Sequence, residues 1–369
     1  MAPKGLILVG GLGTQLRPLT LTKPKALIDF GNKPLLLHLV EALVRAGVTQ
    51  VVLAMNYRPE IMHDFVESCQ AQYNVTIQCC VENEPLGTAG PIALAKQQGI
   101  LDDDEPFFVM NSDIVFDFNL RGLYEFHQAH GKLCTIMVAR VDEPAKYGKS
   151  VVVAHETGLV SRFVEHGRTF AGNVINAGVY IFSPSIFDMI ELRPTSIERE
   201  VLPQLAQDEQ IYSLPLEGYW MNVKQPSDFL QGHSLYLKYL AKRKGDAHCA
   251  ELSPPAPNII GDVNIHPSAQ IGDGCLLGPD VTVGPGCVLE TGVRLARCIL
   301  LENVVVKAHS CVIDSILGWS SSVGTWTRVE GVSVLGEEVH ISGELFINGA
   351  VVLPHKAITT SIPEPQIIM

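Results

Sequence analysis

The sequence predicts an α/β domain with a Rossmann-like mixed sheet, followed by a left-handed parallel β-helix built from hexapeptide repeats. Three observations predict it. Apolar strand-like runs alternate with amphipathic segments in the first part, a polar and proline-rich stretch interrupts the pattern at 242–257, and aliphatic residues then recur every six positions. We therefore expect domains at 1–241 and 258–369 joined by a linker at 242–257.

Length and composition agree with two globular domains. A chain of 369 residues, 47% hydrophobic and 18% charged, is long for one core and is neither disordered nor coiled-coil in composition. The net charge of −12 argues against a nucleic-acid-binding surface, although phosphate ligands need only local positive charge. We interpret the nine cysteines, which form no CxxC pair, as small buried residues in a reducing compartment. The chain shows neither a signal-like N-terminus nor a long apolar stretch, so we expect a cytosolic location and no membrane segment.

The first domain follows a strand–helix–strand order. A buried-strand run at 5–9 ends in two glycines, and the segment 34–45 has helical periodicity. The further expected elements are a strand at 51–54, a helix at 59–68, a strand at 75–81, a helix at 92–98 and a strand at 107–110. In such sheets ligands bind at the carboxyl ends of the strands.

The repeat in the second domain has a period of six. Aliphatic residues predicted to fill its core are Ile265, Ile271, Leu277, Val283, Leu289, Leu295 and Leu301, and, after a phase break at 311–317, Val323, Val329, Leu335, Ile341, Ile347 and Leu353. Small or branched residues follow four positions later at Ala269, Cys275, Val281, Cys287, Val293, Ile299 and Val305. Each six-residue unit would form one side of a triangular coil. The alternative is that ordinary alternating strands produce this six-residue period by coincidence.

A glycine-rich loop follows the first strand. The backbone N–H groups of Gly10, Gly11 and Gly13 have no Cβ atoms beside them and can approach a phosphate closely. Arg17 and Lys25 add positive charge nearby. On its own, this loop is explained equally well by a tight strand-to-helix turn.

The loop is not alone, because the order of motifs resembles the signature of the sugar nucleotidyltransferases. The pattern GGxGTxLxPLT followed by PKxL is similar to their phosphate loop, and matching segments follow at 84–90, 111–113, 163–165, 175–178 and 220–222. The likeness covers essentially the whole chain. It is greatest to the β-subunit type of the GDP-mannose pyrophosphorylase family, and it specifies the family better than the sugar or the base.

The resemblance implies a reaction. An oxygen of mannose 1-phosphate would attack the α-phosphate of GTP, giving GDP-mannose and pyrophosphate. The nucleophile is already an anion, so the reaction needs positioning and charge neutralisation rather than a general base. The family also uses Mg²⁺ or Mn²⁺, hard cations that prefer oxygen ligands.

The resemblance also implies roles for single residues. The nucleotide-binding residues would be Gly10, Gly11, Gly13, Thr14, Glu82, Gly87 and Thr88, with Glu82 reading guanine. The sugar-binding residues would be Asn111, Gly148, Glu165 and Asn176. Arg17 and Lys25 would act on phosphate, and Asp113 would hold the metal. The alternatives are a turn or surface role for Asp113, Glu165 and Asn176, and an exposed strand-end position for Glu82.

Three positions depart from the family pattern. Gln15 replaces an arginine of the phosphate loop, His166 replaces the lysine on the sugar phosphate, and Asn222 replaces the aspartate that is the second metal ligand. Glutamine and asparagine are neutral, and histidine, with an unperturbed pKa of about 6.5, is only partly cationic near neutrality. Loss of one preorganised charge contact typically costs about 3 kcal/mol of transition-state stabilisation.

These departures predict strongly impaired turnover. We expect a regulatory, nucleotide-sugar-binding subunit that assembles, as a homo-oligomer or beside an active homologue, through the β-helix. The alternative is a fully active enzyme in which Lys23, Lys149 or Lys224 supplies a displaced cation. A transferase for another sugar and base is a further alternative.

Overall fold

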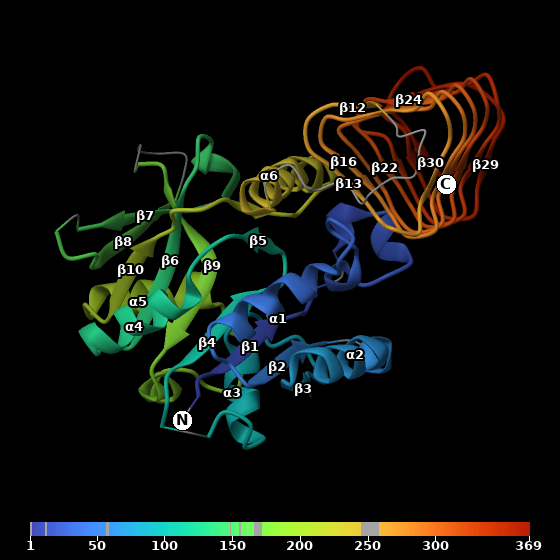
Figure 1. Cartoon of the computed structure of the whole chain (residues 1–369). Coiled ribbons are helices and arrows are strands. Elements are labelled where there is room, and N and C mark those ends of the chain that lie inside the picture. Colours follow the sequence, from blue (N-terminus) through green and yellow to red (C-terminus); the bar gives the residue numbers. More distant parts are fainter. Residues whose placement is uncertain are drawn as a thin grey trace. The chain divides into compact units, whose positions relative to one another are not determined.

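The structure is a computed structural model that describes residues 2–11, 13–56, 59–102, 104–147, 149–154, 156–165, 172–244 and 258–369 (Figure 1). The chain forms two compact units. The first, here called the sheet unit, comprises Met1–Gly11 and Leu36–Trp220. The second, here called the coil unit, comprises Leu12–Leu35 and Met221–Met369. The coil unit thus contains part of the predicted phosphate loop, and the domain bounds at 1–241 and 258–369 stay a prediction.

The sheet unit is built on a nine-stranded mixed sheet, which confirms the predicted fold class. Its main strand order is β10-β6-β9-β4-β1-β2-β3, and β7 and β8 form a hairpin attached to β9. The strand β9 runs antiparallel to β4 and β6, whereas the other neighbours in that order are parallel. The strands are β1 (Lys4–Leu8), β2 (Gln50–Met55), β3 (Thr76–Val81), β4 (Phe107–Asn111), β6 (Cys134–Arg140), β7 (Lys149–Val153), β8 (Val160–Glu165), β9 (Val174–Phe182) and β10 (Ile211–Pro215).

Three helices of this part lie where the sequence predicted them, namely α1 (Leu35–Arg45), α2 (His63–Tyr73) and α3 (Gly90–Gln97). The sequence analysis did not predict α4 (Leu120–His130) and α5 (Leu202–Gln207). The helix expected at 59–68 begins as a 3₁₀ turn at Pro59–Met62 and then continues five residues further than expected. Apolar strand residues such as Leu6, Val109 and Tyr180 are fully buried and form the core, so the sheet edge is left to carry the polar groups.

The coil unit contains the β-helix, whose strands stack into three parallel sheets (Figure 1, orange to red). One sheet contains β12 (Asn258–Ile259), β15 (Leu276–Leu277), β18 (Arg294–Ala296), β21 (Cys311–Ile313), β24 (Arg328–Glu330) and β27 (Phe346–Asn348). The next contains β13 (Val263–Ile265), β16 (Val281–Val283), β19 (Cys298–Leu300), β22 (Ile316–Leu317), β25 (Val334–Leu335), β28 (Val351–Val352) and β30 (Ile367–Ile368). The third contains β14 (Gln270–Ile271), β17 (Val288–Leu289), β20 (Val305–Val306), β23 (Ser322–Val323), β26 (His340–Ile341) and β29 (Ala357–Ile358).

The repeat register differs from the prediction at three turns. The core contains Leu300 and Val304 in place of the predicted Leu301 and Val305, and Val352 in place of Leu353. The register moves because the steps that end at Leu300, Leu317 and Val352 are one residue shorter than the regular period. The first shortened step therefore precedes the predicted phase break.

Within the coil unit, the segment 13–35 is attached to the β-helix together with α6 (Pro226–Lys244). Asn32 Nδ2 donates to the Val283 carbonyl at 3.1 Å, and Asn264 Nδ2 donates to the Gly31 carbonyl at 3.0 Å. The Phe30 ring packs on Phe229 of α6 with 5.2 Å between ring centres. These contacts order the chain that follows the glycine loop.

The described cysteines agree with the expectation from the sequence. The eight cysteines among the described residues are free thiols, buried or half-buried, as the sequence predicted. Among the described residues, no helix has the length and apolar character needed to cross a membrane.

Candidate functional site

The parallel strands β1, β2 and β3 end at one edge of the sheet, and the residues that follow them meet there. Val9 N–H donates to the Ala54 carbonyl at 2.7 Å, and Glu82 N–H donates to the Met55 carbonyl at 2.8 Å. A Cβ atom on Gly10 would lie 3.8 Å from Glu82 Oε1. The structure therefore brings two predicted nucleotide residues, Gly10 and Glu82, together.

Glu82 is not an exposed strand-end residue. Its side chain is only 8% exposed, and its Oε2 accepts a hydrogen bond from Leu86 N–H at 2.8 Å. Burial raises the pKa of its carboxyl group, while the Leu86 hydrogen bond opposes that shift. One carboxylate oxygen thus shapes the following loop, and the other lies toward Gly10.

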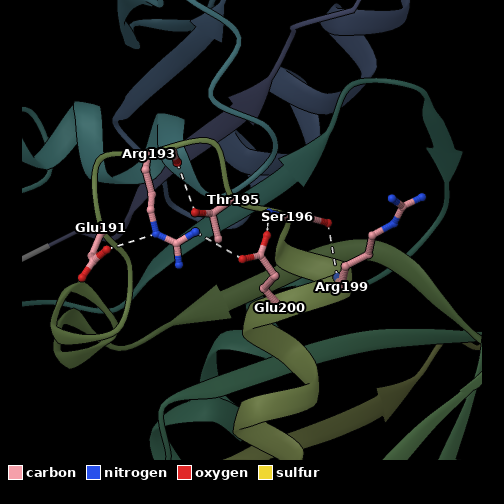
Figure 2. Close-up of polar contacts among 6 residues, drawn as sticks. All are labelled: Glu191, Arg193, Thr195, Ser196, Arg199 and Glu200. Carbon is pink, nitrogen blue, oxygen red and sulfur yellow. Dashed lines mark hydrogen bonds and ion pairs between the residues drawn. The ribbon is translucent and has the colours of Figure 1, made fainter.

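The glycines of the 84–90 motif make room for another stretch of chain, the segment 191–200 (Figure 2). Gly87 has φ +72°, and a Cβ atom on it would lie 2.4 Å from the Thr195 carbonyl oxygen. That oxygen accepts from Thr88 N–H at 3.0 Å and from Ala89 N–H at 2.9 Å, and Thr195 N–H donates to the Leu86 carbonyl at 3.0 Å. Any larger residue than glycine at position 87 would separate the two segments.

The predicted sugar residues Asn111 and Asn176 lie on the neighbouring strands β4 and β9. Gly178 has φ +77°, and a Cβ atom on it would lie 2.8 Å from Asn111 Nδ2, which explains the glycine of the 175–178 motif. Asn176 Oδ1 accepts from Gly178 N–H at 3.1 Å. Asp113 follows in the turn between β4 and β5 (Ile114–Phe116) and is half-buried. Two of the predicted sugar residues, Asn111 and Asn176, and the predicted metal ligand Asp113 thus share this part of the sheet.

In the coil unit the structure brings Gly13 and Lys25 together. Gly13 has φ +56°, and a Cβ atom on it would lie 2.9 Å from Thr20 Cγ2 and 3.2 Å from Lys25 Cβ. Thr20 Oγ1 donates to the Gly13 carbonyl at 2.8 Å. The glycine is therefore required for this turn, and the turn places the Lys25 stem beside the loop.

The other predicted residues of the coil unit have more open surroundings. Thr14 and Gln15 begin a 3₁₀ turn, and both are exposed, as is Arg17. Asn222 ends β11 (Trp220–Asn222) and is half-buried. Lys23, one of the candidate replacement cations, has its Nζ 4.8 Å from the centre of the Trp319 ring and already has that interaction.

Three predicted site positions escape structural description. Gly148 and His166 lie outside the described residues. The backbone of Glu165 ends β8, but its side chain is not described.

In the sheet unit, Asp113 offers one carboxylate that suits a divalent cation arriving with a phosphate ligand. No group of three or more His, Cys, Asp or Glu side chains among the described residues could hold a metal by itself. Mg²⁺ in nucleotide enzymes is commonly held by one or two carboxylates together with phosphate oxygens. A single carboxylate therefore fits the ion, with the remaining ligands coming from phosphate and water.

Sequence reasoning missed the segment 193–198 and Tyr180. Ser196 caps the turn that follows it by accepting from Arg199 N–H at 3.2 Å, and Glu200 accepts from Ser196 N–H at 2.9 Å. A serine with a glutamate three residues later is a recognisable helix-start signal. Here the glutamate comes four residues after the serine, at a π-helical turn, so that signal is not met. The contact of this segment with the 84–90 loop is tertiary and has no local signal.

The described residues also enclose a cavity of about 680 Å³ in the sheet unit, lined by parts of β6, β7, β9 and β10 and by Trp220. None of the predicted site residues whose side chains the structure describes lines this cavity. The Trp220 indole N–H donates to the Ala177 carbonyl at 2.9 Å, so the tryptophan of the 220–222 motif helps to fix β9.

A glycine-lined loop after the first parallel strand, beside a buried glutamate and followed by a β-helix, defines a nucleotidyltransferase with a hexapeptide-repeat domain. Comparison with known families agrees with this class. The family described as "Nucleotidyl transferase" matches residues 4–239, and the family described as "GMPPB C-terminal domain" matches residues 259–368.

Relatives that match the chain over its full length identify the family within this class. The chain is 52% identical to "Probable mannose-1-phosphate guanylyltransferase 2" of Oryza sativa subsp. japonica, over 99% of this chain and 100% of that protein. It is 50% identical to "Mannose-1-phosphate guanylyltransferase 1" of Arabidopsis thaliana over the same shares. It is 52% identical to "Mannose-1-phosphate guanyltransferase" of Schizosaccharomyces pombe, over 99% of each chain. The chain belongs to the mannose-1-phosphate guanylyltransferase family.

Solved structures resemble the sheet-bearing part. HddC from Yersinia pseudotuberculosis, complexed with GMP-PN, is 28% identical with a TM-score of 0.52, over 63% of this chain and 98% of that chain. A putative glucose-1-phosphate thymidylyltransferase from Bacillus anthracis has a TM-score of 0.55 at 20% identity, over 63% of this chain and 95% of that chain, which shows the shared fold.

Proposed function

We propose that this chain binds GTP, GDP-mannose and mannose 1-phosphate, that it forms GDP-mannose only slowly, and that it acts mainly as a nucleotide-sugar-binding subunit beside an active homologue. The names of its relatives support the ligands, and the complex of HddC with GMP-PN supports a guanine nucleotide. The observation that carries the proposal of slow turnover is the replacement of three charged family positions by Gln15, His166 and Asn222, within otherwise matching motifs.

The retained residues would bind and orient the reactants. Backbone N–H groups at Gly10 and Gly11 would approach the nucleotide phosphates, and Glu82 would accept from the guanine edge with the oxygen that Leu86 N–H does not use. Asn176 would hold a sugar hydroxyl. The phosphate oxygen of mannose 1-phosphate would then form its bond to the α-phosphorus as the bond to pyrophosphate breaks, and no proton transfer is needed.

This chain differs from the family pattern in the residues that would neutralise phosphate charge. Lys25 sits beside Gly13, whereas Gln15 is neutral and exposed. A divalent cation bound with the substrates would neutralise phosphate charge. Asp113 would hold it, and Asn222 would add a weaker, uncharged oxygen. Because the charge that develops on the pyrophosphate would meet fewer fixed cations, turnover would slow more than binding weakens.

Full catalytic activity is the second candidate function. Identities of 49–53% over essentially the whole length to proteins named as mannose-1-phosphate guanylyltransferases favour it. Lys149 or Lys224 would then supply the missing cation, since Lys23 is engaged with Trp319.

The two candidates are separated by measuring binding and turnover in the same preparation. Calorimetry should show binding of GDP-mannose and GTP, and a pyrophosphate-release assay with Mg²⁺ or Mn²⁺ should show a turnover number at least about 100-fold below that of an active relative. Other sugar phosphates and nucleotides, tested as pairs, check the choice of mannose and guanine. Turnover equal to that of an active relative would reject the slow-subunit proposal, and absence of nucleotide binding would reject both candidates.

Assembly through the β-helix and a cytosolic location stay predictions. Sedimentation of the purified chain, alone and mixed with an active homologue, tests the first. A mass equal to one chain under both conditions would contradict it.

A further inference from the structure

A continuous hydrogen-bond chain joins a predicted nucleotide residue, Thr88, to a predicted sugar residue, Asn176. Thr88 Oγ1 donates to Glu198 Oε2 at 2.9 Å. Tyr180 O–H donates to Glu198 Oε1 at 3.2 Å, and Asn176 Nδ2 donates to the Tyr180 oxygen at 2.9 Å. The two carboxylate oxygens of Glu198 thus serve the two sides of the site separately.

The direction of each hydrogen bond is fixed by chemistry. Burial and the Glu198 carboxylate raise the pKa of Tyr180 well above its usual value, so its hydroxyl keeps the proton that it donates. Thr88 Oγ1 accepts from Ile197 N–H at 2.8 Å, so its own proton goes to Glu198. An ionised carboxylate has only acceptors, and it therefore accepts at both ends without conflict.

The backbone that carries Glu198 is held firmly against the nucleotide side. Besides the Thr195 contacts with the 84–90 loop, Arg193 bonds Glu200 at 3.3 Å across the turn that carries Glu198 (Figure 2). Ser196 Oγ adds a second donor to Glu198 Oε2 at 3.1 Å. From this segment the Glu198 side chain reaches Tyr180 in β9, the strand that carries Asn176.

We propose that Glu198 is a positioning residue that couples the two ligand sites, because it sets the orientations of Thr88 and Asn176 at the same time. The proposal rests on the proposed function for the identity of the two ligands. Nucleotide bound against Thr88 restricts the chain Glu198–Tyr180–Asn176, so the sugar phosphate meets an Asn176 already ordered. Coupling between two binding sites is reciprocal, so mannose 1-phosphate tightens nucleotide binding by the same factor.

The variant Glu198→Gln tests the proposal. Its amide has one acceptor oxygen and one NH₂ group, so either Tyr180 or the Thr88 and Ser196 pair faces a donor instead of an acceptor. Glu191→Gln is the matched control, because it makes the same change in the same segment at an exposed residue bonded only to Arg193 among the contacts drawn in Figure 2. Tyr180→Phe removes the link to Asn176 and leaves the Thr88 bond in place.

Calorimetry measures the dissociation constant of mannose 1-phosphate without and with a non-hydrolysable GTP analogue. It also measures the dissociation constant of the analogue without and with mannose 1-phosphate. The unmodified chain and Glu191→Gln should show tightening by about 5-fold or more, the usual lower range of coupling between sites. Glu198→Gln and Tyr180→Phe should bring that factor close to one. Tyr180→Phe should also bind the analogue alone as the unmodified chain does.

The outcomes separate this proposal from the proposed function. If the unmodified chain binds both ligands independently, or if both variants keep the full coupling, the coupling proposal is wrong and the function stands. If the unmodified chain binds neither ligand, both are wrong. Thermal unfolding of each variant identifies loss of fold, and should Glu198→Gln fail to fold, Tyr180→Phe alone decides.

Discussion

Single glycines in this protein are required by what lies opposite them. Gly87 is left-handed and faces the Thr195 carbonyl oxygen, and Gly178 faces the Asn111 amide. The motifs that contain these glycines were recognisable in the sequence, but their physical reason lies in contacts between distant segments. Gly10 is the exception, because a Cβ atom on it would meet only ordinary contacts, the nearest being with Asn56 and Glu82 at 3.8 Å.

Gly87→Ala should destabilise the protein and weaken nucleotide binding. A side chain costs about 1–2 kcal/mol in the left-handed region, and here it also meets the Thr195 oxygen. Urea unfolding and the dissociation constant of GTP measure the two effects. Gly99→Ala is the control, because Gly99 is also left-handed (φ +69°) but has no heavy atom of the described chain within 4 Å of its Cβ position. Equal losses in both variants would show that Thr195 does not matter.

At the scale of elements, α4 is attached to the sheet through His127, which is buried, and His130, which is half-buried. His127 Nδ1 bonds Thr135 Oγ1 of β6 at 2.7 Å, and its Nε2 bonds Ser183 Oγ at 3.0 Å. His130 bonds the same Thr135 hydroxyl at 2.7 Å. Burial lowers the pKa of His127 to about 4 and that of His130 to about 4, so both are neutral near pH 7.

This cluster predicts loss of stability in mild acid. Below pH 6.5 the unfolded chain takes up protons at these histidines while the folded chain does not, so the free energy of unfolding falls as pH decreases from 6.5 toward 4. His127, 1% exposed, alone accounts for about 3 kcal/mol over that range. Urea unfolding at pH 7.0 and at lower pH measures the slope, which His127→Gln should flatten. The variant His63→Gln, at an exposed histidine, is the control and should leave the slope unchanged. If His127→Gln has the same slope as the unmodified chain, His127 is not the source of the pH dependence.

Most elements could be predicted because their signals are local. The alternation of apolar runs with amphipathic segments located β1 to β4 and α1 to α3 within a few residues, and the six-residue period located the β-helix. The register moved at Leu300 and Val352 because a shortened turn changes every later position without changing the composition. The segment 193–198 was missed because its role comes from the loop that it contacts.

At the scale of the whole molecule, the segment that follows the glycine loop belongs to the same compact unit as the β-helix. The sequence suggested a structural repeat separated by a linker. The contacts of Asn32, Asn264 and Lys23 show that the repeat also orders the residues leading to and from Lys25. The β-helix therefore supports the segment that carries Gly13 and Lys25, two of the residues predicted to act on phosphate.

Asn264→Ala should accordingly weaken nucleotide binding, although the residue lies far along the sequence from the loop. The substitution removes the hydrogen bond to the Gly31 carbonyl, which contributes about 1 kcal/mol. Because the loss loosens the loop, we expect the affinity for GTP to fall several-fold. Calorimetry with GTP checks this. Asn258→Ala, an exposed asparagine of β12, is the control. If the two variants bind GTP equally, the β-helix does not support the loop through this contact.

We propose that this chain keeps its ligand site while the charges of that site are depleted. The decisive measurement is steady-state pyrophosphate release with GTP, mannose 1-phosphate and Mg²⁺, comparing the unmodified chain with the triple variant Gln15→Arg, His166→Lys and Asn222→Asp. Restoring the charges should raise turnover by about 100-fold or more with a smaller change in nucleotide affinity. A triple variant no faster than the unmodified chain would contradict the account.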